Sequence, residues 1–370
     1  MTRTSYIYVN YHGMSLVELL VAIAIGSVLM LGLATTFKNS SDTSREMERS
    51  GRLIENGRYA IDLLASELHH AGYYGYYYAA LAAPGSLPDP CEVGSITNIT
   101  SAMAMPIQGY TAANLTSRPD ISATSCDNKG LFTTANVNAG SDILVVRRAS
   151  TAVFTGSPTT NEIYLQSNPR DAAILLGNSS ATVPAMAANN SAQSMMKYPF
   201  NTASTVAADT RKYNTHVYFI APCSFGSGTD EVCTTSDDTI PTLKRLELTS
   251  SGTSTIMNVV PLVEGVEYMK ITYGIDTSPT TVNLTTGYAG DGIPDSYVAT
   301  PSLAQWPLVV AVRFHLLIRS TGNTPGYVDT KQYAFPSAGV TLGAFNDAFK
   351  RHVYSTEVRP MNLAGRREVP

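Results

Sequence analysis

The chain has 370 residues, of which 44% are hydrophobic and 15% are charged, so it can bury a sizeable core yet is poor in charge for a soluble protein. Its formal net charge of −4 provides no basic surface of the kind that binds nucleic acid by counterion release. The sequence contains no phosphate-binding loop, zinc-protease helix or serine-hydrolase elbow, and its histidines suggest no shared ligand geometry. These features argue against generic DNA binding and against an enzyme, and no catalytic residue can be named.

The first 37 residues hold the most informative pattern. Residues 1–13 are polar and aromatic and end in a glycine, and the apolar run Met14–Phe37 that follows has Glu18 as its only charge. The nineteen uncharged residues of Leu19–Phe37 would form about 28 Å of helix, enough to cross a bilayer. Because no small-residue cleavage site follows the run, we expect it to remain on the mature chain as a transmembrane anchor.

Glu18 needs an explanation, because a stranded carboxylate inside a membrane costs about 2.5 to 3.5 kcal/mol. One explanation is a capping box, in which Ser15 and Glu18 bond to each other's backbone at the start of the helix. The other is that Gly13, Met14 and Glu18 resemble the processing site of a type IV prepilin, where a peptidase cuts after the glycine and methylates the new amine. That amine, on Met14 of one subunit, would then pair with Glu18 of a neighbour. We favour the prepilin interpretation, because a capping box does not explain a leader ending in glycine.

Residues 38–80 are predicted to continue the helix outside the membrane. Charged residues are frequent, but apolar residues recur at intervals of seven, which is typical of an amphipathic helix covering a sheet. Gly72 and Gly75 end the pattern. The apolar stripe consists of Met47, Ile54, Ile61 and Leu68.

Residues 81–370 are predicted to form a β-rich domain, so the expected fold class is α+β. Apolar and polar residues alternate clearly over 310–318, which indicates a strand with one buried face. The section 81–201 is rich in Ser, Thr and Asn, and we expect it to be an insertion of long loops and irregular strands rather than a second domain. Other short β-branched or aromatic runs predict strands at 142–148, 215–221, 243–248, 266–275 and 352–358.

The four cysteines indicate disulfide bonds formed outside the cytosol. Cys91, Cys126, Cys223 and Cys233 form no C-x-x-C pair, and their even number fits two bridges in an exported chain. Three pairings are possible, of which the sequential one is the simplest.

One stretch offers a weak candidate for a bound ion. Asp276, Asp291 and Asp295 could contribute oxygen ligands to calcium, since residues 291–295 resemble the tail of an aspartate-rich calcium loop. The upstream positions of such a loop are Tyr, Ala and Gly here, so a turn with Asx hydrogen bonds is the better interpretation. We therefore expect no cofactor, with calcium as the alternative.

Several segments resemble the PilW family of type IV pilus minor pilins. The segment Leu53–Tyr76 contains E-N-G-R-Y-A and ends in H-A-G-Y-Y-G, and residues 262–276, 291–297 and 351–363 follow in the order that this family shows. Met361 stands where the family has an arginine, which leaves the register of the last strand open.

The resemblance implies a pilin fold and a structural role. A protein of this kind would be a single-pass inner-membrane protein with a periplasmic domain, processed by the prepilin peptidase. It would join other minor pilins and the major pilin in a complex that primes the pilus and stays at its tip beneath a PilY-type adhesin. Two alternatives are a minor pseudopilin of a type II secretion system and a surface receptor that binds DNA or host sugars through Tyr73–Tyr78.

Overall fold

The computed structural model describes residues 13–77, 81, 83–128, 136–177, 197, 206–226, 232–278 and 290–368. The chain divides into two compact units, Met1–Gly51 and Arg52–Pro370, and helix α1 (Leu16–His69) runs without interruption through the boundary. Of the predicted leader, only Gly13 lies within the described residues.

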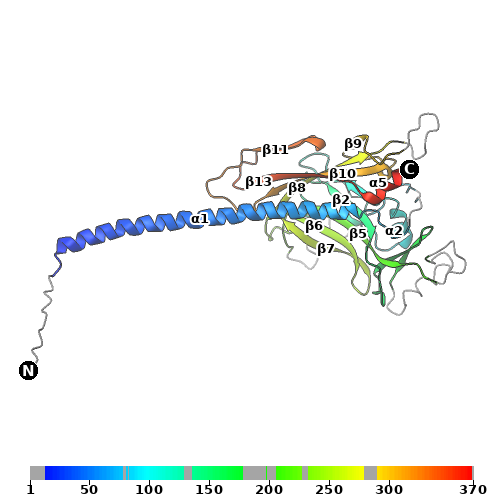
Figure 1. The fold of residues 1–370 in the computed structure, drawn as a ribbon, viewed down its shortest axis with the longest axis horizontal. Coiled ribbons are helices and arrows are strands. Elements are labelled where there is room, and N and C mark those ends of the chain that lie inside the picture. Colours follow the sequence, from blue (N-terminus) through cyan, green and yellow to red (C-terminus); the bar gives the residue numbers. More distant parts are fainter. Residues whose placement is uncertain are drawn as a thin grey trace, which may run out of the picture. The chain divides into compact units, whose positions relative to one another are not determined.

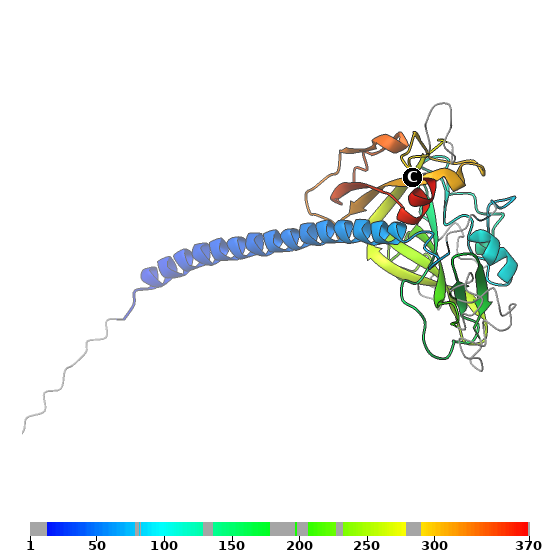
Figure 2. The ribbon, with the colours of Figure 1, turned by 45° about the vertical axis from the view of Figure 1, so that its right-hand side comes forward.

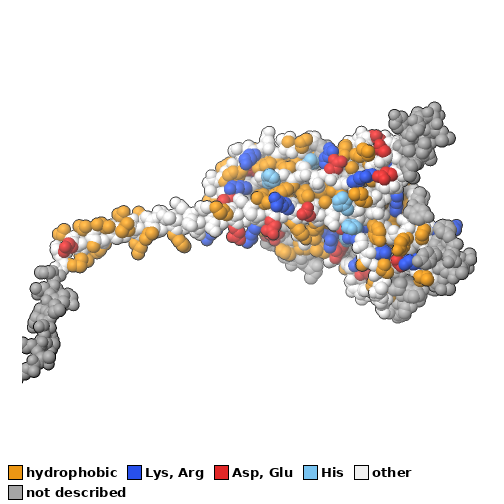
Figure 3. All heavy atoms as spheres, in the orientation of Figure 1, with side chains coloured by type: hydrophobic (Ala, Val, Ile, Leu, Met, Phe, Trp, Pro, Cys, Tyr) orange, Lys and Arg blue, Asp and Glu red, His pale blue; other side chains and the backbone are white. Residues whose placement is uncertain are grey.

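In the first unit, α1 presents apolar side chains around its whole circumference. Every large apolar side chain of Met14–Phe37 is more than half exposed, and Figure 3 shows hydrophobic atoms along this part of the helix. By length and composition alone, α1 is able to cross a membrane. A surface this apolar is unfavourable in water, so it requires lipid or other helices around it.

The second unit is built from antiparallel strands (Figure 1). Its larger sheet has seven strands, with β1, β2, β5, β3 and β4 in that order, β6 beside β5, and β7 beside β6. The strands are β1 (Ile107–Tyr110), β2 (Ile143–Ala149), β3 (Ile163–Ser167), β4 (Ala172–Leu176), β5 (Thr210–Ala221), β6 (Thr242–Ser250) and β7 (Thr255–Glu264).

The smaller sheet has four strands in the order β13, β10, β8, β9. These are β8 (Val266–Ile275), β9 (Ser296–Val298), β10 (Val309–Arg319) and β13 (Arg351–Val358). In β13, Val358 pairs with Val312 and Arg351 with Arg319, which fixes the register of the last strand. The remaining elements are the hairpin β11 (Gln332–Phe335) and β12 (Val340–Gly343), the helices α2 (Ile96–Ala102), α3 (Ser125–Asn128) and α5 (Met361–Arg367), and the 3₁₀ turns η1 (Trp306–Leu308) and η2 (Pro336–Ala338).

The main core lies where the two sheets and the second-unit part of α1 meet. Leu53, Ala60, Leu64 and Leu68 of α1 share one buried cluster with apolar residues of both sheets and with Trp306 of η1. Figures 1 and 2 both show this part of the helix lying along the strands. The helix therefore completes a core that neither sheet closes by itself.

The predicted apolar stripe is only partly correct. Leu68 is buried, but Met47 is 70% exposed and Ile54 is 47% exposed. The helix packs through the face that carries Leu53, Gly57 and Ala60 instead. Glycine and alanine on that face allow the strands to approach the helix closely. Because these residues are small, they do not stand out in a pattern of large apolar side chains.

A second core covers the opposite face of the seven-stranded sheet. Cys91 and Cys126, together with Ile99 and Met103 from the α2 region, pack there against residues of β2, β3 and β5. The section 81–201, for which long loops and irregular strands were expected, supplies strands β1 to β4 and part of a core in its described part, and β2 lies at the strand predicted for 142–148. Short strands such as β4, with the sequence AAILL, carry no period-2 alternation by which they could be recognised.

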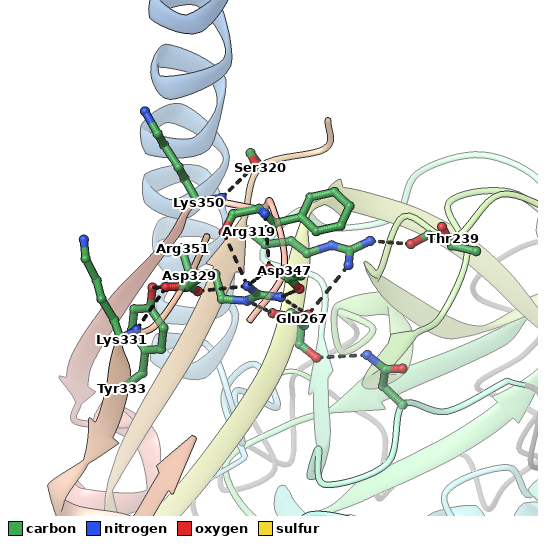
Figure 4. A network of polar contacts seen from close by, with 12 residues as sticks. Thr239, Glu267, Arg319, Ser320, Asp329, Lys331, Tyr333, Asp347, Lys350 and Arg351 are labelled. Atoms are coloured by element: carbon green, nitrogen blue, oxygen red, sulfur yellow. Dashed lines mark hydrogen bonds and ion pairs between the residues drawn. The ribbon is translucent and has the colours of Figure 1, made fainter. Parts of the chain in front are cut away.

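A buried ionic network fastens the segment between β10 and β13 to the smaller sheet (Figure 4). The Arg351 guanidinium, whose side chain is 1% exposed, contacts Glu267 of β8 at 2.6 Å, Asp329 at 2.9 Å and Asp347 at 2.7 Å. Hydrogen bonds from Arg351 lower the pKa of Asp347. These charges hold the segment that contains the β11–β12 hairpin, and they belong to the scaffold.

Candidate assembly site

The start of α1 contains the Glu18 half of the expected capping box, while the Ser15 hydroxyl caps the helix through Val17 in place of Glu18. The backbone N–H of Ser15 donates to the Glu18 carboxylate at 3.1 Å, and the N–H of Val17 donates to Ser15 Oγ at 3.3 Å. All these groups are exposed. Glu18 can therefore cap the helix within a single subunit, without a partner subunit.

The capping bond is not an ion pair. A backbone N–H carries only a partial positive charge, so the cap does not balance the charge of a carboxylate beside an apolar helix. Removal of residues 1–13 would place a positive amine on Met14, one helical turn away from this carboxylate. A carboxylate in this position can accept a cation, because a paired charge is far less costly in a membrane than an isolated one.

At Gly57, within the E-N-G-R-Y-A segment, α1 lies directly against the Tyr354 ring of β13. A Cβ added at Gly57 would lie 2.2 Å from Cε2 of the Tyr354 ring. The ring therefore occupies the space that any other residue at position 57 would need. The Asn56 side chain adds a hydrogen bond of 3.0 Å to the backbone carbonyl of Glu264, the last residue of β7. Gly57 and Asn56 thus place the helix between the two sheets.

Glu67 is a buried charge on the sheet-facing side of α1. Its carboxylate lies 2.8 Å from Nε of Arg148 on β2 and 2.7 Å from Nδ1 of His216 on β5. Burial by itself raises the pKa of Glu67, but hydrogen bonds and charge attraction from His216 and Arg148 outweigh it and lower the pKa to about 2. This ionic contact fixes the rotation of the helix against the larger sheet.

The H-A-G-Y-Y-G end of α1 meets the C-terminal helix α5, although the two are far apart in the sequence. Gly72 has a φ of 70°, a conformation suited to glycine, and its N–H donates to the carbonyl of Arg147. The Asn362 side chain donates to the carbonyl of Ala71 at 3.1 Å, and Leu363 packs beside Gly72. Both Figures 1 and 2 show α5 beside the end of α1. The two segments that resemble the PilW family near opposite ends of the chain therefore contact each other.

The carboxylates proposed for calcium already have protein partners. Asp276 is buried and pairs with Arg367 of α5 at 2.9 Å, and Asp295 accepts hydrogen bonds from Thr277. Asp291 accepts from the N–H of Ile293, which is the Asx turn expected for this stretch. Among the residues described here, no group of three or more His, Cys, Asp or Glu side chains is placed to hold a metal ion.

Both disulfides are present with sequential pairing. Cys91 is bonded to Cys126 and Cys223 to Cys233, and these bridges close 35-residue and 10-residue separations. All four cysteines lie in the second core. The Cys91–Cys126 bridge therefore links two segments that cover the larger sheet, and the Cys223–Cys233 bridge closes part of the connection between β5 and β6.

Two family models match parts of the chain. The sequence profile described as Type IV Pilus-assembly protein W matches residues 223–362, and the prokaryotic N-terminal methylation motif matches residues 9–34. Together these matches support a PilW-family type IV pilin. The methylation motif includes Gly13, Met14 and Glu18, and the PilW match includes β8, β10 and β13.

Among solved structures, the chain is similar to a type IV-like pilin from Thermus thermophilus. The two share 19% sequence identity over 40% of this chain and 79% of the other, with a TM-score of 0.21. A likeness at this TM-score is too weak to support further inference. No curated protein matches the chain in sequence. The apolar helix and the methylation motif fit a membrane-anchored pilin, which is a structural class of protein.

Sequence reasoning identified the N-terminal site but missed the contacts that dock the helix. Any two of Glu67, Arg148 and His216 are at least 68 residues apart, so no local sequence spacing relates them. One signal was available, because Glu67 interrupts the apolar face next to Leu64 and Leu68. A charge on a buried helix face indicates a partner on the opposing sheet.

Proposed function

We propose that this PilW-family protein is a minor pilin that helps to prime assembly of the type IV pilus within a minor-pilin complex at the tip. The observation that carries the proposal is the N-terminal part of α1, where exposed apolar side chains surround a helix that begins at a charged Glu18. Such a helix is stabilised by a nonpolar environment around its side chains and by a cation near Glu18. The membrane, and later a bundle of similar helices, would supply both.

The route of assembly follows from this arrangement. The prepilin peptidase would cut after Gly13, and the new amine on Met14 would take part in pairing between subunits. The membrane would hold the processed chain until other minor pilins and the major pilin engage its helix. The domain formed by residues 52–370 would remain in the periplasm as a rigid body and offer its surface to a PilY-type adhesin.

The decisive experiment is a deletion of the gene, followed by counting surface pili by electron microscopy and complementation with the wild-type gene. The proposal predicts few or no pili, restored by the wild type but not by Gly13→Leu, which the peptidase cannot process. Immunoblots of the membrane fraction serve as the control for protein level. Normal piliation combined with loss of protein secretion would instead identify a pseudopilin of a type II secretion system.

A further inference from the structure

The two disulfides differ in the charged groups around them. Nζ of Lys244 on β6 lies 3.8 Å from Sγ of Cys223, and the Lys244 side chain is completely buried. At the other bridge, the Asp89 carboxylate accepts a hydrogen bond from the N–H of Cys91 at 2.9 Å and another from Ser125 at 2.8 Å. A carboxylate thus lies close to the backbone of each bridge, Asp89 at Cys91 and Asp238 at Ser224, but the Cys223–Cys233 bridge also has an amine beside its sulfur.

These neighbours act in opposite directions on reduction. A nearby cation stabilises a cysteine thiolate and makes it a better leaving group, whereas a nearby carboxylate destabilises it. Burial does not distinguish the two bridges, since all four cysteines are at most 3% exposed.

We infer that the Cys223–Cys233 bridge is a thiol-exchange site with Cys223 as its leaving group, which makes it a redox-sensitive element of the periplasmic domain. The reductant is a dithiol. Its thiolate attacks Sγ of Cys233, the S–S bond breaks, and the electron pair goes to Cys223 as a thiolate beside Lys244. The second thiol of the reductant then attacks the mixed disulfide and releases Cys233. Two electrons and two protons pass to the cysteines, and the reductant leaves as a disulfide.

Contacts that do not involve sulfur keep both reduced cysteines in place. The N–H of Cys233 donates to Asn136 at 3.1 Å. Next to Cys223, the Ser224 hydroxyl donates to Asp238 at 2.6 Å, and its N–H donates to the same carboxylate. The thiols therefore stay close to each other and the bridge can form again. The chain reaches the surface two residues after Cys223, where Phe225 is 57% exposed.

The test is a redox titration of the full-length protein in detergent, using mixtures of reduced and oxidised dithiothreitol. At each ratio, free thiols are alkylated, the remaining bridges are reduced and labelled with a second reagent, and both cysteine pairs are quantified by mass spectrometry. We expect Cys223–Cys233 to open at a lower ratio of reduced to oxidised reagent than Cys91–Cys126. Lys244→Met should shift the midpoint of Cys223–Cys233 by about tenfold toward higher ratios, because a thiol pKa changes by about one unit when a charged neighbour is removed. Cys91–Cys126 should not shift.

Two further variants keep the test decisive if Lys244→Met does not fold. Lys244→Arg retains the positive charge and should leave the Cys223–Cys233 midpoint near that of the wild type. Asp89→Asn keeps an oxygen acceptor but removes the negative charge, so Cys91–Cys126 should open at a lower ratio than in the wild type. Opening of Cys91–Cys126 before Cys223–Cys233 in the wild type would overturn the inference, as would an unchanged Cys223–Cys233 midpoint in folded Lys244→Met.

Discussion

The buried Glu67 gives the most quantitative prediction. Its pKa falls from an ordinary 4.5 to about 2 in the folded protein, and each pKa unit is worth about 1.4 kcal/mol. The carboxylate therefore contributes on the order of 3 kcal/mol to the free energy of unfolding at neutral pH. Because the folded pKa is the lower one, this contribution is fully present above about pH 4.5 and is lost as the pH falls toward 2. Replacing Glu67 with Gln should remove it and leave Arg148 without its counterion.

The measurement uses Trp306, the single tryptophan, as the probe of unfolding. This residue is 3% exposed and packs against Tyr273 in the main core, so its fluorescence reports loss of that core. Urea unfolding of wild type and Glu67→Gln is followed from pH 7 to pH 2, and the difference in free energy of unfolding is plotted against pH. Glu55→Gln is the matched control, because Glu55 is exposed on the same helix; it should change stability by less than about 0.5 kcal/mol.

The expected difference for Glu67→Gln is about 3 kcal/mol near neutral pH and becomes small near pH 2, where the protonated glutamate resembles glutamine. A difference that is constant with pH would mean that the effect comes from packing and not from charge. A loss no larger than that of Glu55→Gln would refute the assignment of Glu67 as an ionic contact that docks the helix.

Three other perturbations have definite outcomes. Gly57→Ala should destabilise the fold by about 1 to 3 kcal/mol, because the added methyl group clashes with Tyr354. In a Tyr354→Ala background, where only helix propensity remains, the same substitution should stabilise by up to about 1 kcal/mol. Equal effects in both backgrounds would exclude the clash. Gly13→Leu should leave only the larger unprocessed precursor on an immunoblot, and a band of mature size would show that the peptidase cuts elsewhere. A fragment that begins near Ser40 should be monomeric and folded by size-exclusion chromatography and circular dichroism, whereas aggregation would show that the domain needs a partner subunit.

The anchor and several main strands could be predicted because their signals are local. The uncharged run after Glu18 defines a membrane helix by length alone, and alternation over 310–318 identified the central part of β10. The face on which α1 packs could not be predicted in the same way. It depends on Gly57 and on Tyr354, which lies about 300 residues later, and only the folded chain brings the two together.

The candidate site likewise combines contacts that local sequence patterns predict with contacts that they do not. Ser15 and Glu18 are three residues apart, so their capping box could be derived from helix geometry, and the structure contains its Glu18 half. The partners of Asp276 could not be derived, because Arg367 reaches it from the C-terminal helix 91 residues away. Similarly, the contribution of residues 81–201 to a second core depends on pairing with β5, beyond any local sequence pattern.

The most direct test of the central claim separates the two roles of Glu18 in a single experiment. Glu18→Gln retains a side chain that can complete the capping box but has no charge, whereas Glu18→Ala loses both functions. Each protein is tagged, purified from membranes in mild detergent and probed for co-purifying minor pilins, with an immunoblot to confirm the processed size. The assembly account predicts that both variants are processed after Gly13 and that neither captures the other pilins. Normal capture by Glu18→Gln, together with loss in Glu18→Ala, would contradict pairing with a neighbour's amine and leave the helix cap as the function of Glu18.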